Sequence, residues 1–270
     1  MPSIQPRFIT GVLGVPDYTA LQLREPRSRV ALVIPVINEG VRISGQLERI
    51  RAESPDVDVI IADGGSTDGS TEPEELTKFG VNTLLQKTGP GRLSAQLRMA
   101  FHHSLRDCSY DAVITMDGNG KDGVEGIDKV LKALREGADF VQGSRFITGG
   151  NAENTPVSRL LAIRLIHAPL TSLGAGHWFT DSTNGFRGHS RRLLLDPRLS
   201  IFREVFDAYE LLAYLPIRAS RLGFKVLEVP VSRTYPNDQE IPTKIRGTLS
   251  HLKLVRVLLS AILGSFDPKP

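Results

Sequence analysis

The sequence predicts an α/β fold in which a mainly parallel central sheet is flanked by helices. Between residues 30 and 145, short apolar runs alternate with segments that mix apolar and charged residues, which is the pattern of consecutive βαβ crossovers. The apolar runs are almost uninterrupted, as expected of strands that are buried on both faces of a parallel sheet. Polar loops rich in Gly, Asp and Ser follow several of these runs, and such loops are typical of turns.

The expected elements follow one another along the chain without a long linker. Strands are expected at 30–36, 58–62, 81–85, 112–116 and 139–142, and helices at 41–52, 73–79, 93–105 and 124–136. After residue 145 the pattern loosens. Apolar residues at helical spacing predict helices at 156–173 and 203–215, and 224–231 is expected to be a late strand with Pro230 near its end.

The chain is predicted to form one α/β domain, residues 29–240, with halves at 29–145 and 146–240. Residues 1–28 lack periodicity, and we expect an irregular lead-in there. Residues 241–270 are predicted to form a basic amphipathic C-terminal helix. Its expected basic face holds Arg246, Lys253 and Arg256, and its expected apolar face holds Leu252, Leu259 and Ile262. Such a helix either docks against the domain or lies on an anionic membrane surface.

Composition limits the class of protein. Of the 270 residues, 40% are hydrophobic and 23% charged, as in soluble globular proteins. The single cysteine, Cys108, excludes an intramolecular disulfide and favours a reducing compartment. Neither a secretory signal nor a membrane-spanning apolar run is visible, so a cytoplasmic location is expected. A net charge of +3 is too small to indicate a nucleic-acid partner.

Polar residues gather where the predicted strands end. Asn38-Glu39, Asp63–Asp68 and Asp117–Asp122 follow three different strands, and ligands of open parallel sheets bind beyond the carboxyl ends of strands. Acidic strand ends suit ribose hydroxyls, base N–H groups or a divalent cation. Neither a P-loop nor a Gly-x-Gly-x-x-Gly after the first strand is present, which argues against a P-loop NTPase and a standard dinucleotide dehydrogenase.

The order of these loops resembles the nucleotide-sugar domain of family 2 inverting glycosyltransferases, whose fold is called GT-A. Six motifs carry the resemblance: Val33–Glu39 (VIPVINE), Ala62–Gly69 (ADGGSTDG), Gly89–Arg92 (GPGR), Met116–Lys121 (MDGNGK), Gly143–Phe146 (GSRF) and Asn184–Arg187 (NGFR). The last two narrow the resemblance to the enzymes that use a polyprenyl phosphate, such as dolichol-phosphate mannosyltransferase. The resemblance spans residues 30–260.

The resemblance implies a UDP-sugar or GDP-sugar donor and a set of residues that bind it. By this resemblance Pro35, Asn38 and Glu39 border the nucleotide, and Asp63 contacts the base or ribose. The 89–92 loop closes over the base, and Lys244 approaches the diphosphate. In chain order the donor-binding residues are Pro35, Asn38, Glu39, Asp63, Gly89, Arg92, Asp117, Gly118, Asn119 and Lys244.

The resemblance also implies a divalent cation, Mg²⁺ or Mn²⁺. Asp117 would be the first residue of the Asp-x-Asp signature that binds the metal, but Asn119 replaces the second aspartate and Lys121 replaces a frequent glutamine. Asn119 can still offer a neutral oxygen to the metal. Protonated Lys121 cannot ligate, but it can donate to a phosphate as a point charge. We expect a metal held by Asp117 and Asn119, with Lys121 as an alternative catalytic cation.

The acceptor side is predicted to rest on basic residues. The spacing of Arg145 and Arg159 after Asp117 is similar to that of two arginines that hold the acceptor phosphate in the polyprenyl-phosphate enzymes, and paired guanidinium groups suit a phosphate dianion. Arg187 belongs to the acceptor-site segment. A phosphate acceptor is already ionised and needs no general base, whereas an alcohol would need one. For that case Asp181 is the first candidate and Glu210 the second.

Three functions remain open at this stage. The first is sugar transfer from a nucleotide sugar to a polyprenyl phosphate, with the protein at the cytoplasmic membrane face. The second keeps the donor chemistry but uses a soluble sugar or small metabolite as acceptor. The third is a non-catalytic module that binds a nucleotide sugar after losing a metal ligand at Asn119.

Overall fold

The computed structural model describes residues 5–108, 110–236 and 248–269, and the side chains of the last segment from residue 252 onward. The chain divides into two compact units. Unit 1 contains Met1–Gly120 and Ile201–Ala208, and unit 2 contains Lys121–Ser200 and Tyr209–Pro270.

The strands of unit 1 form a mostly parallel array. Their order is β1 (Arg7–Ile9), β2 (Tyr18–Gln22), β5 (Thr83–Lys87), β4 (Asp58–Asp63), β3 (Val30–Val36) and β6 (Ala112–Thr115). β3 pairs in parallel with both β4 and β6, and β4 pairs in parallel with β5. β4 and β6 are buried along their whole length, which explains why the central strands read as continuous apolar runs.

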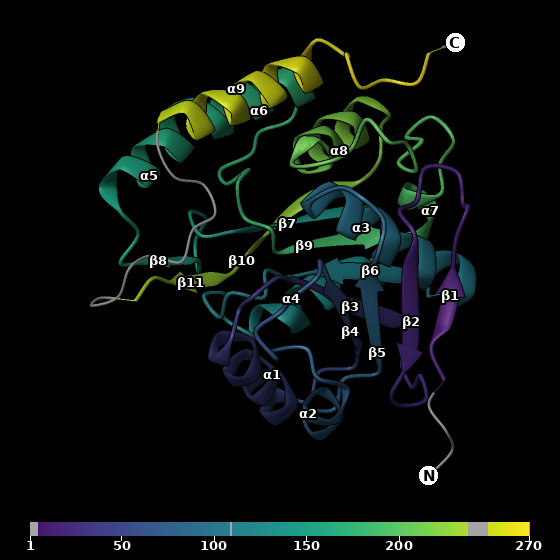
Figure 1. The fold of residues 1–270 in the computed structure, drawn as a ribbon. Coiled ribbons are helices and arrows are strands. Elements are labelled where there is room, and N and C mark those ends of the chain that lie inside the picture. The colour runs from purple at the N-terminus through teal and green to yellow at the C-terminus, as the bar shows by residue number, and fades with distance from the viewer. Residues whose placement is uncertain (1–4, 109, 237–247, 270) are drawn as a thin grey trace. The chain divides into compact units, whose positions relative to one another are not determined.

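Helices cover both faces of this array. The helices are α1 (Val41–Glu53), α2 (Pro73–Lys78) and α3 (Leu93–His102), which continues into the π-helical turn η1 (His103–Asp107). The chain moves from β3 through β4 to β5 and then returns to β6, so right-handed crossovers place α1 and α2 on one face and α3 on the other. Figure 1 shows this arrangement, and α3 contacts β3, β4 and β5.

The start of the chain differs from the predicted irregular lead at residues 1–28. β2 pairs antiparallel with β5, and β1 pairs antiparallel with β2. Both strands are short and lie at the edge of the sheet, where only one face is covered, so neither yields a long apolar run. Tyr18 and Ala20 are the inward-facing positions of β2.

A second difference concerns residues 203–215, for which the sequence predicts one helix. The helix begins only at Glu210, and residues 201–208 are non-helical and belong to unit 1. There the carbonyls of Asp207 and Ala208 accept hydrogen bonds from the backbone N–H groups of Arg92 and Ser94, at 3.1 and 2.8 Å. The segment therefore caps the first turn of α3, whose N–H groups have no partner within the helix.

The paired strands of unit 2 fall into two groups. β7 (Phe140–Ser144) pairs in parallel with β10 (Val226–Pro230) and antiparallel with β9 (Arg187–Ser190), and α4 (Gly126–Arg135) contacts all three strands. β8 (Asn151–Glu153) pairs in parallel with β11 (Ser232–Thr234). The mostly parallel sheets with flanking helices confirm the predicted α/β class.

Unit 2 contains further helical segments. They are α5 (Val157–Ala162), the π-helical turn η2 (Ile163–His167), α6 (Ala168–Ala175), α7 (Arg191–Leu194), α8 (Glu210–Arg221) and α9 (Thr248–Ile262). α5, η2 and α6 follow one another without a gap, where the sequence predicts one helix at 156–173, and α8 contacts both α6 and α9. Within the described residues, none of the helices combines the length and apolar character needed to cross a bilayer.

The faces of α9 differ from those predicted. Leu258 and Ala261 are its buried residues, whereas Leu252 and Leu259 are exposed on the same helix as Lys253 and Arg256. The predicted opposition of a basic and an apolar face is therefore wrong for the described residues, because α9 buries a third face against α6 and α8. The predicted contribution of Arg246 lies outside the described residues.

Candidate functional site

In unit 1, the polar loops after β3 and β4 are tied together. Asn38 donates its backbone N–H to the Ser66 hydroxyl at 3.0 Å, and its side-chain oxygen accepts the N–H of Thr67 at 2.8 Å. Asp63 is buried, and its carboxylate accepts hydrogen bonds from Gly65, Ser66 and Thr71. Asp63 therefore shapes its own loop, so any contact with a base or ribose must use its remaining lone pairs.

Two glycines allow close approaches between backbone segments. A Cβ on Gly118 would lie 3.0 Å from the Pro35 carbonyl oxygen, so a larger residue here would crowd the end of β3. A Cβ on Gly89 would lie 2.7 Å from the backbone nitrogen of Asp17. Both positions were predicted to bind the donor, and in both the missing side chain is needed for packing.

Asp117 and Asn119 lie together in the loop after β6. The Asn119 amide nitrogen is 3.5 Å from a carboxylate oxygen of Asp117, and both side chains are half-buried. Gln46 fixes this loop by donating to the Asp117 carbonyl at 3.0 Å and accepting from the Gly120 N–H at 2.9 Å. Searched over the described residues, the structure shows no group of three His, Cys, Asp or Glu side chains arranged for a metal. The pair nevertheless fits a magnesium-like cation, which needs few protein oxygens when phosphates and water complete its shell.

In unit 2, cationic side chains surround the ring of Tyr235. The Lys121 ammonium lies 5.0 Å from the ring centroid, and the Arg159 and Arg233 guanidinium carbons lie at 5.6 and 5.9 Å. Arg159 also donates to the Tyr235 hydroxyl at 2.9 Å. Arg233 donates to both carboxylate oxygens of Asp122, at 2.7 and 2.8 Å. We call Lys121, Arg159, Arg233 and Tyr235 the cationic cluster.

The electrostatic effect of this cluster is visible in Tyr235 itself. Burial alone would raise the pKa of its hydroxyl. The charge of Arg233, and the hydrogen bond and charge of Arg159, outweigh burial and lower the pKa below its ordinary value. The cluster is therefore a region of positive potential.

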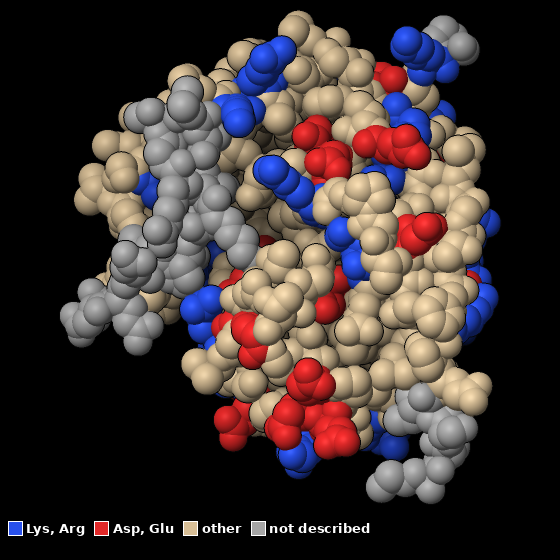
Figure 2. All heavy atoms as spheres, in the orientation of Figure 1, with Lys and Arg blue, Asp and Glu red and all other residues tan. Residues whose placement is uncertain are grey.

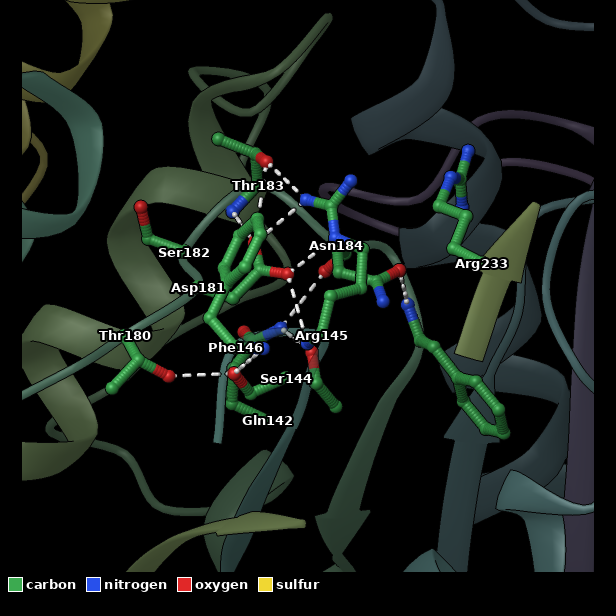
Figure 3. A network of polar contacts seen from close by, with 12 residues as sticks. Gln142, Ser144, Arg145, Phe146, Thr180, Asp181, Ser182, Thr183, Asn184 and Arg233 are labelled. Carbon is green, nitrogen blue, oxygen red and sulfur yellow. Dashed lines mark hydrogen bonds and ion pairs between the residues drawn. The ribbon is translucent and has the colours of Figure 1, made fainter. Parts of the chain in front are cut away.

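Arg145 and Asp181 form a buried ion pair beside β7 (Figure 3). The Arg145 guanidinium donates to both oxygens of Asp181, at 2.6 and 2.9 Å, and to the Thr183 hydroxyl at 3.0 Å. Burial would lower the pKa of Arg145, but the hydrogen bond and charge of Asp181 raise it. Since both Asp181 oxygens are engaged with Arg145, the structure gives this carboxylate the role of an arginine partner rather than of the predicted general base.

Glu228 on β10 holds the loop that carries Asp181. Its carboxylate accepts the backbone N–H groups of Thr180 and Asp181, at 3.0 and 3.1 Å, and the Thr180 hydroxyl at 2.8 Å. Burial raises the pKa of Glu228, although these hydrogen bonds act in the opposite direction. Glu228 thereby fixes the position of Asp181, and Asp181 fixes Arg145.

Comparison with known proteins places the chain in a family. Glycosyl transferase family 2 matches residues 31–195, which is more than half of the chain. The chain belongs to this family. The predicted family 2 glycosyltransferase is thus confirmed, and the enzyme class follows from it.

Relatives of this glycosyltransferase include enzymes of lipid-phosphate metabolism. It is 29% identical to the polyprenol monophosphomannose synthase of Mycolicibacterium smegmatis, over 90% of each chain. It is 30% identical to the undecaprenyl-phosphate mannosyltransferase of Micrococcus luteus, over 76% of this chain and 83% of that protein.

Solved structures confirm the GT-A fold of the glycosyltransferase. Glucosyl-3-phosphoglycerate synthase from Mycobacterium tuberculosis, in complex with Mn²⁺, UDP and glucosyl-3-phosphoglycerate, superposes with a TM-score of 0.62 over 90% of this chain and 81% of that chain. The sequence identity is 18%, so this likeness concerns the fold alone.

The contacts of the other predicted site residues do not indicate a ligand. Arg187 is buried and donates to the carbonyls of Ser182, Asn184 and Leu212, contacts that brace the backbone around residues 182–184. Its predicted role as an acceptor ligand stays a prediction. The remaining positions stay predictions: Glu39 accepts from Arg42, Arg92 precedes α3, Glu210 begins α8, and Lys244 lies outside the described residues.

Sequence reasoning missed two members of the cationic cluster and one support of the ion pair. Arg233 and Tyr235 lie on and just after the three-residue strand β11, and Glu228 lies on β10. No local pattern marks these positions. A basic residue on a late strand is a common surface feature. Arg233 and Tyr235 are two residues apart and so share one side of extended backbone, but only the tertiary fold brings them beside Asp122 and Arg159.

Proposed function

We propose that this glycosyltransferase moves a sugar from a nucleoside diphosphate donor to a polyprenyl phosphate, acting as a peripheral protein at a membrane surface. The observation that carries the proposal is the cationic cluster, whose guanidinium and ammonium groups suit a phosphate dianion. The likeness to the polyprenol monophosphomannose synthase of M. smegmatis, over 90% of both chains, supports the same acceptor.

The donor is proposed to bind to unit 1, beyond the ends of β3, β4 and β6. Asn38 and Glu39 border the nucleotide, and the loop at Asp117 and Asn119 receives the diphosphate. A divalent cation held by Asp117 and Asn119 would act as a Lewis acid that neutralises the leaving diphosphate.

The acceptor phosphate is proposed to bind to unit 2 at Arg159, Arg233 and Lys121. One phosphate oxygen forms a bond to the anomeric carbon while the bond from that carbon to the diphosphate breaks, so the sugar is transferred with inversion. The attacking oxygen is already ionised and requires no general base. This chemistry agrees with an Asp181 whose oxygens are both engaged by Arg145.

A transfer assay tests the proposal. Purified protein is incubated with UDP- or GDP-sugars and either a polyprenyl phosphate, a phosphorylated small metabolite or a free sugar, and products are identified by mass spectrometry. We expect a glycosyl polyprenyl phosphate from one donor class. Transfer only to a soluble acceptor would replace the proposed acceptor, and nucleotide binding without turnover on any acceptor would favour a non-catalytic module.

A further inference from the structure

The continuous helical segment α5–η2–α6 carries an exposed apolar stripe. Val157, Leu161, Leu165 and Leu173 are 70, 50, 69 and 78% exposed, and Pro169, at the intervening fourth-residue position, is also exposed. In an α-helix a four-residue repeat stays near one face but drifts by about 40° per step. The wider π turn of η2 lies within the stripe and reduces this drift. These residues therefore line one side of the segment.

The exposed face of α9 carries a second apolar stripe. Leu252, Leu259 and Leu263 are 64, 42 and 81% exposed, and their spacing places them on one face with Arg256 between them. Lys253 is exposed beside this stripe. The buried residues, Leu258 and Ala261, lie on the opposite side.

The two stripes belong to neighbouring helices. α6 and α9 pack so closely that a Cβ on Gly174 would lie 2.6 Å from a side-chain carbon of Ile262. Arg221 of α8 donates to the carbonyls of both Gly174 and Ile262, at 2.6 and 2.8 Å. Both helices also pack against α8 (Figure 1), and the residues of both stripes are exposed. Where Figure 1 draws α9, Figure 2 shows a largely uncharged surface with basic side chains.

We propose that these two stripes form one docking surface for an anionic lipid bilayer. The inference rests on the proposed function, since it names the surface by which the enzyme would reach a lipid acceptor. Large exposed apolar patches mark interaction sites, and leucines flanked by basic residues suit insertion at the headgroup boundary. Trp178, which follows α6 and is 72% exposed, adds a side chain typical of membrane interfaces.

Charge favours a bilayer over a protein as the occupant. Residues 157–180 and 241–266 contain no Asp or Glu, while Arg164, Lys253 and Arg256 are exposed. Anionic headgroups attract such side chains by about 1 kcal/mol each. A second copy of this chain would instead bring like charges together.

The docking surface is linked to the cationic cluster through α5. Arg159 lies between Val157 and Leu161 of the stripe and donates to the Tyr235 hydroxyl. One short helix would therefore contact the bilayer on one face and supply a phosphate-binding cation on another.

Vesicle sedimentation tests the docking surface. The full chain is mixed with vesicles of phosphatidylglycerol and phosphatidylcholine, or of phosphatidylcholine alone. We expect binding to the anionic vesicles that weakens with salt, and at least a tenfold loss of binding in the double variant Leu161→Glu/Leu165→Glu. The control variant Leu13→Glu/Val41→Glu changes two side chains of unit 1 that are 91 and 87% exposed, and it should bind like the wild type.

Separate readouts distinguish failure of the surface from failure of the proposed function. Transfer to a water-soluble short-chain prenyl phosphate should be unchanged in the Leu161/Leu165 variant, because that acceptor needs no bilayer. A wild type that binds vesicles but transfers nothing would overturn the function and leave the surface standing. Equal vesicle binding by both variants would overturn the surface. So would a lipid-free dimer that the Leu161/Leu165 variant dissociates, since the surface would then be a protein interface.

Discussion

Among single residues, Tyr235 reports directly on the proposed phosphate site. Its pKa is lowered because Arg233 and Arg159 favour the phenolate more than burial disfavours it. Tyr18 and Tyr110 behave oppositely, because burial and the nearby carboxylates of Asp107 and Asp58 raise their pKa values. Spectrophotometric titration should therefore show one tyrosine that ionises below its ordinary pH range, and Tyr235→Phe should remove that phase.

Repeating this titration with a bound anion tests the proposed phosphate site directly. Pyrophosphate or phosphate bound at the cationic cluster would offset the charges of Arg159 and Arg233, so the phenolate would lose its stabilisation and the pKa of Tyr235 would rise. The same anions should leave the titration of the Tyr235→Phe variant unchanged. If neither phosphate nor pyrophosphate changes the pKa of Tyr235, the cationic cluster does not bind the phosphate.

At this scale the sequence marks some of the candidate residues and not others. Arg145, Arg159 and Asp117 stand out because family motifs and spacing mark them. Tyr235 and Glu228 do not, since they form their contacts with Arg159 and with the Asp181 loop only in the folded chain. The same limit explains why Asp181 was predicted as a base. Its position in the acceptor segment is visible in the sequence, but its bidentate contact with Arg145 is not.

Among the elements, the buried central strands and the late strand β10 could be predicted, and the three-residue strands could not. β3, β4 and β6 are buried on both faces and therefore leave apolar runs in the sequence. β1, β8 and β11 contain three residues each, too few for a periodicity to appear. The start of α8 was misplaced because residues 201–208 cap α3, a tertiary interaction with no local signal.

The packing of α6 against α9 can be tested with a pair of glycine substitutions. Gly174→Val would push a side chain into Ile262 and Ile217, at 2.6 and 3.4 Å from the added Cβ, and overpacking of this kind costs about 1–3 kcal/mol. Gly45→Val on α1 is the matched control, because nothing lies within 4 Å of its added Cβ. Urea unfolding should show lower stability for the first variant and little change for the second. Equal effects would mean that α6 and α9 do not pack as described.

For the whole molecule, the sequence predicted one domain whose halves divide near residue 145. The structure instead divides after Gly120, and residues 201–208 return to unit 1. The boundary falls within the Asp117–Asp122 loop, between Asn119 and Lys121. The residues predicted to serve one diphosphate site thus come from both units. Asp117 in unit 1 and Lys121 in unit 2 can therefore be substituted separately to test their roles in binding the diphosphate.

Substitutions of the proposed donor residues and of the proposed acceptor residues should affect different ligands. Asp117→Asn removes the one charged ligand of the proposed cation, so calorimetric titration should show nucleotide affinity in Mn²⁺ at least tenfold weaker, or about 1.4 kcal/mol. The response of Tyr235 to phosphate should persist in this variant.

Arg159→Gln should instead leave nucleotide binding intact and weaken the use of the acceptor by about 2–3 kcal/mol. Lys132→Gln, an exposed cation on α4, is the control for lost charge. If chelation leaves nucleotide binding unchanged and Lys121→Gln abolishes it, the cation at Asp117 is replaced by Lys121, and the proposed metal site is wrong.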